Sequence, residues 1–202
     1  MRSLDLDALA DCLVKRLFVP VEASGRHVHL TKEQALTLFG HTLTPERPLS
    51  QPGQFLAKER VSIIGPKGEF QNVAVLGPER PEAQVEVSLT DGKVLGIQPP
   101  IRPSGQVAGS PGVTVVGPLG QVRLEQGVLA AQRHIHLSPE DAAQFNVKDK
   151  QIVKLRVYGC RPTVFEEVLV RVHPQYASAA HLDYDEANAC GFRKGCLGRI
   201  LV

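Results

Sequence analysis

A five-residue motif occurs twice in this chain, and the two copies lie about half a chain apart. Residues 26–30 read Arg-His-Val-His-Leu, and residues 133–137 read Arg-His-Ile-His-Leu, 107 residues further on. Each copy is followed by the start signal of a short helix. Thr31 and Ser138 are capping residues, each with a Gln or Asp three positions later, and Pro139 suits the first helical position. The repeat therefore predicts two related units, each with a strand that leads into a capped helix.

Most of the chain after residue 18 alternates with a period of two, which is typical of short strands. Residues 84–89 form one alternating run, and Asp91–Gly92 is the expected turn after it. Eighteen Gly and fifteen Pro fit a turn-rich protein. We therefore expect a mainly β fold, built as small barrels or as a sandwich. The predicted hairpins pair residues 61–64 with 70–76, 112–117 with 122–124, and 151–158 with 163–172.

Two segments depart from the strand pattern. Residues 3–17 predict an amphipathic helix that Ser3 can cap. Residues 99–112 hold four Pro and three Gly, which makes this segment the best candidate for a linker or a long loop. The apolar stripe of the helix comprises Leu6, Leu9, Leu13 and Leu17.

Composition excludes several classes of protein. Hydrophobic residues make up 43% of the chain and charged residues 22%, but no apolar run approaches the roughly 20 residues of a membrane span. A net charge of +2 and an aromatic content of 5% without Trp argue against nucleic-acid binding. No secretory signal is visible, so a cytosolic setting with free thiols is expected. A Cys190–Cys196 disulfide is the less favoured alternative; the other cysteines are Cys12 and Cys160.

The paired histidines predict metal binding. Residues two apart in a strand point to the same face, so both imidazoles of a pair can reach one cation. The first pair is His27 with His29, and the second is His134 with His136. Glu86, on the polar face of its strand, is the candidate third ligand of the first site, and His181 that of the second. Three protein ligands leave an open coordination position, as in catalytic zinc sites.

The remaining candidate residues are arginines and histidines outside the two groups. Arg80 lies in a loop six residues before Glu86, where a guanidinium could bind phosphate or carboxylate, although a solvated loop arginine is the alternative. Arg26 and Arg133 alternate with the histidines, so we interpret them as structural residues or ion-pair partners. His41 and His173 lie in contexts that favour a surface position.

The chain resembles the PduL-type phosphotransacylases (phosphate propanoyltransferases), which are zinc enzymes of many bacterial microcompartments. The resemblance covers nearly everything from residue 19 to residue 191. It is strongest in the two Arg-His-x-His-Leu motifs. The matching stretches are ASGRHVHLTKEQA, LSQPGQF, VSIIGPKGEFQNVAVLGPERPEAQVEVSLTD, LGIQPPIRPSG, GSPGVTVVGP, GVLAAQRHIHLSPEDA and HLDYDEANACGF.

This resemblance implies two β-barrels capped by short helices, with the chain interleaved between them. Residues 18–25 together with 132–202 would form the first barrel, and residues 26–131 the second. Residues 1–17 would be an encapsulation peptide or part of the enzyme's own cap. A homodimer is implied, located in the cytoplasm and within the microcompartment lumen.

The resemblance also implies the site. Two zinc ions would lie between the barrels, with the coenzyme A sulfur as a further ligand of the first and waters on the second. Arg80 matches a phosphate-binding arginine. Ser24 and Asn188 match positions near the coenzyme A nucleotide. The implied ligand sets are His27, His29 and Glu86 for the first ion and His134, His136 and His181 for the second.

The implied reaction is acyl-CoA + phosphate ⇌ acyl phosphate + CoA, which we expect to proceed by direct transfer. A shell is an expected partner; nucleic acid and membrane are not. The acyl group is left open among acetyl, propanoyl and lactyl-derived groups, and cobalt or nickel would fit the histidines as well as zinc. A zinc-dependent acyl-CoA hydrolase and a non-catalytic, metal-stabilised cargo protein are the alternative functions.

Overall fold

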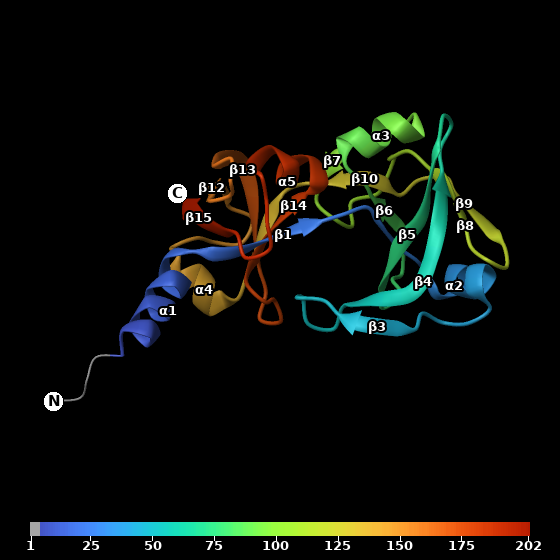
Figure 1. Cartoon of the computed structure of the whole chain (residues 1–202). Coiled ribbons are helices and arrows are strands. Elements are labelled where there is room, and N and C mark those ends of the chain that lie inside the picture. Colours follow the sequence, from blue (N-terminus) through green and yellow to red (C-terminus); the bar gives the residue numbers. More distant parts are fainter. Residues whose placement is uncertain (1–4) are drawn as a thin grey trace. The chain divides into compact units, whose positions relative to one another are not determined.

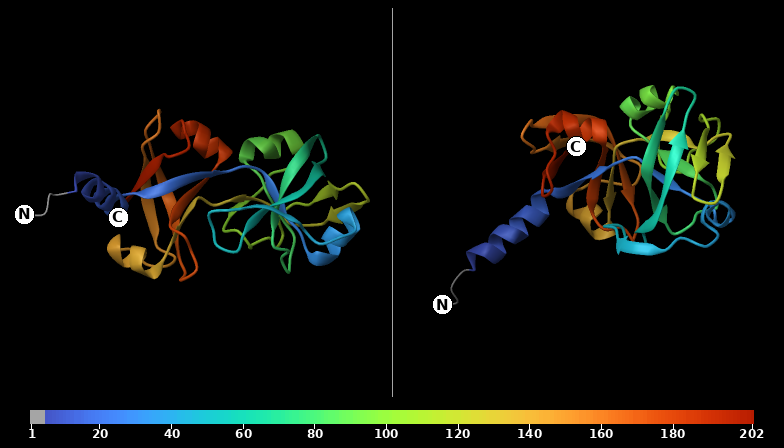
Figure 2. Two further views of the ribbon diagram at one scale, coloured as in Figure 1. Left: turned by 60° about the horizontal axis from the view of Figure 1, so that its bottom comes forward. Right: turned by 45° about the vertical axis from the view of Figure 1, so that its right-hand side comes forward.

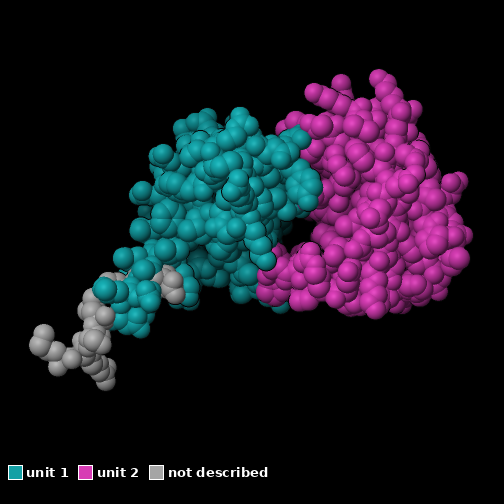
Figure 3. Space-filling model, viewed as in Figure 1, with its two compact units in different colours: residues 1–24, 133–202 teal, residues 25–132 magenta. Residues whose placement is uncertain are grey.

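The computed structural model describes residues 5–202, apart from the side chains of Leu9 and Asp11. This part of the chain forms fifteen strands and five short helices (Figure 1), so the expectation of a mainly β fold with interleaved chain is confirmed. Two compact units make up the molecule. Unit 1 comprises residues 1–24 and 133–202, and unit 2 comprises residues 25–132 (Figure 3).

Unit 1 is a closed six-stranded barrel. Around the barrel the strands are β1 (Val19–Ser24), β14 (Ala179–Asp183), β11 (His134–Leu137), β13 (Thr163–Val172), β12 (Ile152–Val157) and β15 (Leu197–Leu201). Alternation places one face of each strand inside, as β12 shows by burying every second residue. The short helices α4 (Pro139–Gln144) and α5 (Tyr184–Cys190) follow β11 and β14. Fully buried core side chains include Ile135, Leu137, Leu155, Val168 and Val170.

Unit 2 is built on a curled sheet. Its strand path runs β7 (Ile101–Arg102), β10 (Val128–Ala131), β6 (Gln84–Glu86), β2 (His27–His29), β5 (Glu69–Gly77), β4 (Phe55–Ile64), β8 (Val113–Val116) and β9 (Gln121–Leu124), and β3 (Pro45–Pro48) pairs with β4. The helices α2 (Lys32–Phe39) and α3 (Leu89–Leu95) follow β2 and β6. Fully buried core side chains include Val28, Leu30, Ile63, Val75, Val85 and Leu95.

The two units repeat one strand order. The run β10-β6-β2-β5-β4-β8 in unit 2 corresponds to β1-β14-β11-β13-β12-β15 in unit 1. In both units the first of these strands runs parallel to the second, the third is antiparallel to the second, and the fourth is parallel to the third. The first strand of each repeat is exchanged: β1 leads into β2 but belongs to unit 1, and β10 leads into β11 but belongs to unit 2.

The prediction for residues 84–89 is wrong beyond Glu86. Leu89 begins α3, and Asp91–Gly92 lies inside this helix and not in a turn. The reason is a capping box: the Ser88 hydroxyl accepts from the Asp91 N–H, and the Asp91 carboxylate accepts from the Ser88 N–H. All four strands that carry candidate ligands therefore lead into a capped helix, and the expected caps at Thr31 and Ser138 are confirmed.

The remaining predictions of local structure fared as follows. The three hairpins are confirmed as β4–β5, β8–β9 and β12–β13. Helix α1 (Leu6–Leu17) ends where expected but is capped by Asp5, while Ser3 lies outside the described residues. Figure 2 shows α1 extending away from the strands of unit 1. Residues 99–112 are a long loop within unit 2 and do not link two units, because they contain β7 and are followed by more strands of the same sheet.

Candidate metal centres

The first candidate centre lies in unit 2, where β2 and β6 run side by side. His27 is directly opposite Glu86 in the register of the two strands, and His29 lies on the same face. One ligand atom from each residue lies within 4.8 Å of the other two. His27 Nε2 is 3.6 Å from Glu86 Oε2, and His29 Nε2 is 4.0 Å from Glu86 Oε1. Both histidines are buried, at 5% and 2% exposure.

Backbone carbonyls orient both imidazoles of this centre. His27 Nδ1 lies 2.8 Å from the Gly25 oxygen, and His29 Nδ1 lies 3.2 Å from the Leu76 oxygen. A carbonyl only accepts, so each Nδ1 must carry a proton, and Nε2 is the ring atom that faces Glu86. The two Nε2 atoms lie 3.6 and 4.0 Å from the Glu86 oxygens, which is beyond hydrogen-bond distance. Ligands around a tetrahedral zinc ion are about 3.3 Å apart, so the donor set fits a divalent cation.

Glu86 is held in place by two side chains that the sequence analysis did not identify. Gln84 Nε2 donates to Glu86 Oε1 at 2.5 Å, and Ser104 Oγ donates to the same oxygen at 2.9 Å. Gln84 is itself fixed, because its Oε1 accepts from the Gly105 N–H at 2.7 Å. Ser104 and Gly105 belong to the Pro- and Gly-rich loop, so this loop positions the carboxylate. No local motif marks these residues; only the folded loop brings them to β6.

Charge and burial prepare the first centre for a cation. Burial raises the pKa of Glu86, but His27, His29 and the hydrogen bond from Ser104 together lower it more, so the net pKa lies well below its ordinary value and the carboxylate is ionised. Burial, together with the charges of His27 and Arg80, lowers the pKa of His29 to about 2. Arg80 therefore lies near the centre, and its backbone N–H donates to the Leu30 oxygen at 2.8 Å. A neutral imidazole and an ionised carboxylate are the metal-binding forms.

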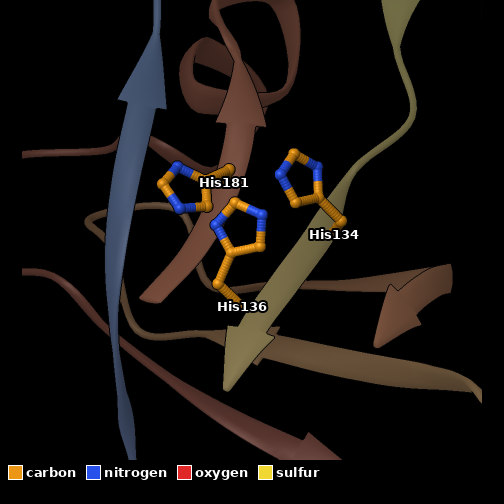
Figure 4. A group of neighbouring side chains, drawn as sticks. All are labelled: His134, His136 and His181. Atoms are coloured by element: carbon orange, nitrogen blue, oxygen red, sulfur yellow. The ribbon is translucent and has the colours of Figure 1, made fainter. Parts of the chain in front are cut away.

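The second candidate centre lies in unit 1 and consists of three histidines (Figure 4). His134 and His136 project from β11, and His181 projects from β14 directly opposite His134. The ring centroids are 4.6–5.0 Å apart. Figure 4 shows the three rings gathered on one side of the strands, with β1 beside β14.

The environment of His136 is the strongest indication that the second centre could bind a metal ion. It is 7% exposed, and both of its ring nitrogens are buried without a hydrogen-bond partner among residues 5–202. Leaving a buried polar group unpaired costs about 1–3 kcal/mol. Burial, with the charges of His134, His181 and Arg171, lowers the pKa of His136 to about 2, so the ring is neutral. A metal bond to one nitrogen would satisfy it, and the donor set fits a divalent cation.

Each centre is flanked by the same combination of an arginine, an acidic residue and a phenylalanine in its own unit. In unit 2, Arg26 forms an ion pair with Asp91 at 2.7 Å, and its guanidinium lies 4.0 Å from the Phe70 ring. In unit 1, Arg133 pairs with Glu186 at 2.8 Å and lies 5.8 Å from the Phe165 ring. Asp91 and Glu186 are both third residues of the helix after the third-ligand strand. The interpretation of Arg26 and Arg133 as ion-pair partners is confirmed.

The structure also places the other residues singled out in the sequence. Ser24 ends β1 and pairs with Asp183, the N-cap of α5, while Asn188 is exposed on the same helix. His41 is exposed, with Nδ1 3.7 Å from a Glu59 oxygen, and His173 is exposed beside Tyr176. Neither belongs to a candidate centre among the described residues. All four cysteines are free.

Comparison with known proteins shows the family of the chain. A family model of phosphate propanoyltransferases matches residues 20–193. The chain belongs to the phosphate propanoyltransferase family. Phosphate propanoyltransferase of Enterococcus faecalis is 50% identical over the whole of both chains. The proteins of that name from Clostridioides difficile and Listeria monocytogenes are each 51% identical, over 93% and 91% of this chain and 90% and 87% of their own.

Membership of this family makes the chain a transferase. It also confirms the resemblance deduced from the two Arg-His-x-His-Leu motifs. In the part of the chain that the structure describes, no helix is long and apolar enough to cross a membrane.

Metal binding to the first centre is expected to weaken as the pH falls. Burial lowers the pKa of His27, but the adjacent Glu86 carboxylate and the Gly25 carbonyl together raise it more, so the net pKa lies above the ordinary 6.5. Below that pKa a metal must displace the proton from His27, and the apparent affinity should fall about tenfold per pH unit. His29, with its pKa of about 2, adds no proton in this range.

Competition between the protein and a metal indicator, from about pH 8 to about pH 5, measures this affinity. The variant H136A disables the second centre, so the titration reports on the first. An affinity that does not change with pH in this range would contradict the assignment of His27 as a ligand.

Proposed function

We propose that this protein is a zinc-dependent phosphate acyltransferase that interconverts a short-chain acyl-CoA and phosphate with an acyl phosphate and CoA. Family membership supports acyl transfer to phosphate. The observation that carries the metal dependence is the duplicated three-donor centre, with its clustered imidazoles, of which His29 and His136 are neutral, and its ionised carboxylate. The two zinc ions and the coenzyme A substrate belong to this proposal.

The two centres would hold one metal ion each. His27, His29 and Glu86 are the ligands of the first, and His134, His136 and His181 those of the second. A bound zinc ion supplies positive charge that stabilises a thiolate or an oxyanion. Three protein donors per ion leave room for a substrate atom on each.

Arg80 binds the phosphate in this proposal. Its guanidinium can donate two parallel hydrogen bonds to a phosphate dianion, and its charge reaches the first centre, as the lowered pKa of His29 indicates. A phosphate oxygen then attacks the thioester carbonyl carbon. The new C–O bond forms as the C–S bond breaks, and CoA departs as the thiolate. The contribution of the protein is to orient the two reactants and to hold charge where it develops.

The coenzyme A subsite is proposed on unit 1. Ser24 ends β1 and pairs with Asp183, the N-cap of α5, and the exposed Asn188 is the fifth residue of that helix. Hydroxyl and amide side chains can both donate to and accept from a nucleotide. The acyl preference lies within the short-chain class, and the experiment below uses a panel to find it.

The decisive experiment is the phosphate dependence of CoA release. Acetyl-, propanoyl- and lactoyl-CoA are each supplied to the protein with and without phosphate, and both free thiol and acyl phosphate are measured. Acyl transfer requires phosphate and yields equal amounts of CoA and acyl phosphate. A hydrolase would release CoA without phosphate, and a metal-stabilised cargo protein would release none; either result would refute the proposal.

We also propose that residues 1–17 direct the enzyme to the lumen of a cytoplasmic microcompartment, where it acts as a homodimer. Helix α1 supports this because Leu6, Leu13 and Leu17 are 69%, 50% and 48% exposed, so its apolar side chains are available to a shell protein. Deletion of residues 1–17 should leave acyl transfer intact and abolish co-purification with shell particles. Unchanged co-purification would show that residues 1–17 do not target the enzyme to the shell.

A further inference from the structure

Arg171 lies beside the second centre, on the same face of the barrel as the histidines. It is on β13, directly opposite His136 on β11, and residues paired in this way share a face of the sheet. The preceding pair, Ile135 and Val170, is fully buried in the barrel core. Because side chains alternate along a strand, His136 and Arg171 both point to the opposite face, where the centre lies.

The guanidinium of Arg171 has no acidic partner. No carboxylate of the described residues lies within 4.0 Å of it, whereas Arg133 on the neighbouring strand pairs with Glu186 at 2.8 Å. The Arg171 side chain lies over the ring of Tyr176, with the guanidinium carbon 5.8 Å from the ring centroid. Tyr176 in turn packs on His136 with the ring centroids 4.1 Å apart. A half-buried cation is therefore held next to the centre by an aromatic ring, without a counter-charge.

Comparison of the two repeats shows that unit 2 has no arginine at the position that corresponds to Arg171. Phe70 and Phe165, and likewise Glu86 and His181, are equivalent residues 95 positions apart. By the same spacing, Leu76 of unit 2 corresponds to Arg171, and Gln175 of unit 1 corresponds to Arg80. Each centre thus has one nearby arginine, supplied from a different position in its repeat.

We propose that Arg171 binds a tetrahedral oxyanion at the second centre, namely the phosphoryl group of inorganic phosphate or of the acyl phosphate. This inference rests on the proposed function and adds a second phosphate-recognising residue to it. The planar guanidinium offers two parallel N–H donors that match two oxygens of a phosphate. Tyr176 limits the directions in which the long side chain can turn, which preorganises it for the anion.

Calorimetric titration of the zinc-loaded protein with inorganic phosphate tests the assignment. Replacing Arg171 with Gln (R171Q) should weaken phosphate binding about tenfold or more, because a charge-assisted, two-pronged contact is lost. R171K keeps the positive charge but lacks the two parallel N–H donors, so its affinity for phosphate should lie between those of R171Q and the unaltered protein. R199Q is the matched control: Arg199 is an exposed arginine on β15 of the same unit, and its variant should bind phosphate as the unaltered protein does.

Two further measurements separate phosphate binding from support of the metal centre and from coenzyme A binding. Elemental analysis should find the same zinc content in R171Q and in the unaltered protein, and loss of zinc would reassign Arg171 to support of the centre. Titration with CoA should give an unchanged dissociation constant. Weaker CoA binding with unchanged phosphate binding would assign the arginine to the coenzyme phosphates and overturn the proposal.

Kinetics complete the test. The KM for phosphate should rise in R171Q while the KM for acyl-CoA stays the same. Phosphate affinity within twofold of that of the unaltered protein, at equal zinc content, would overturn the proposal. Failure of the proposed function itself would be seen separately, as the absence of phosphate-dependent CoA release in the unaltered protein.

Discussion

Substitution of His29 by Ala (H29A) is expected to remove one bound metal ion per chain and to lower the rate of acyl transfer by at least about a hundredfold. Changes to residues that only support metal ligands already cost 10- to 100-fold in affinity or activity, so loss of a ligand should cost at least about as much. His29 is 2% exposed with its Nε2 directed at Glu86, and no other described histidine besides His27 lies in this centre. No other described histidine could therefore take the place of His29 in this centre.

Metal content and rate should be measured together for H29A, for H136A and for a control. H136A should lose the other metal ion, since His136 belongs to the second centre. H41A is the control, because the exposed His41 lies outside both centres. If H29A and H136A both kept two metal ions per chain, the assignment of the centres would be wrong.

Substitution of Arg80 by Ala (R80A) is expected to lower kcat/KM for phosphate by about a hundredfold or more. Removal of one preorganised donor to a developing negative charge costs about 10²–10³-fold in other enzymes, and a guanidinium supplies two such donors with a full charge. Metal content should not change, because Arg80 is not one of the donors of the first centre. The charge of Arg80 helps to lower the pKa of His29, so that pKa should rise in the variant.

Phosphate saturation curves and elemental analysis give the answer for R80A. R47A serves as the matched control, since Arg47 is an exposed arginine of the same unit on β3. R80K should be intermediate because it retains the charge. A phosphate dependence in R80A equal to that in R47A would remove Arg80 from the site.

The paired histidines of the candidate centres could be predicted from sequence because their geometry is local. His27 and His29 are two residues apart in a strand, so their common face follows from strand geometry alone. Placing the third candidate ligand of each centre requires knowledge of the strand pairing. Glu86 and His181 are placed by the antiparallel pairing of β6 with β2 and of β14 with β11, and no spacing in the sequence specifies that pairing. The third candidate ligand is directly opposite the first histidine of the pair in both units, so the repeat extends to the strand register.

The exchange of β1 and β10 between the units could not be read from periodicity. A strand alternates in the same way whichever barrel receives it, so the pattern of residues 19–24 does not say that they pair with β14 and β15. Helix α3 was missed for a different reason. The alternation of residues 84–89 matched a strand, but the capping box of Ser88 with Asp91 satisfies the first backbone N–H groups of a helix and ends the strand early.

The residues that support the centres were also missed, since their roles depend on contacts between distant segments. Ser104 reaches Glu86 from a loop that the composition marked only as irregular. Arg171 gains its position from the pairing of β13 with β11. Sequence alone ranks such residues as ordinary polar or strand positions. They become informative once the strand registers are known.

Stepwise metal reconstitution tests the two-centre assignment most directly. The chain is stripped of metal, zinc is added in increments, and phosphate-dependent CoA release is measured against the number of zinc ions bound per chain. Two catalytic centres predict that the stripped protein is inactive and that the rate reaches its maximum only as the second equivalent binds. Full activity in the stripped protein, or a rate that already reaches its maximum at one zinc ion per chain, would contradict it.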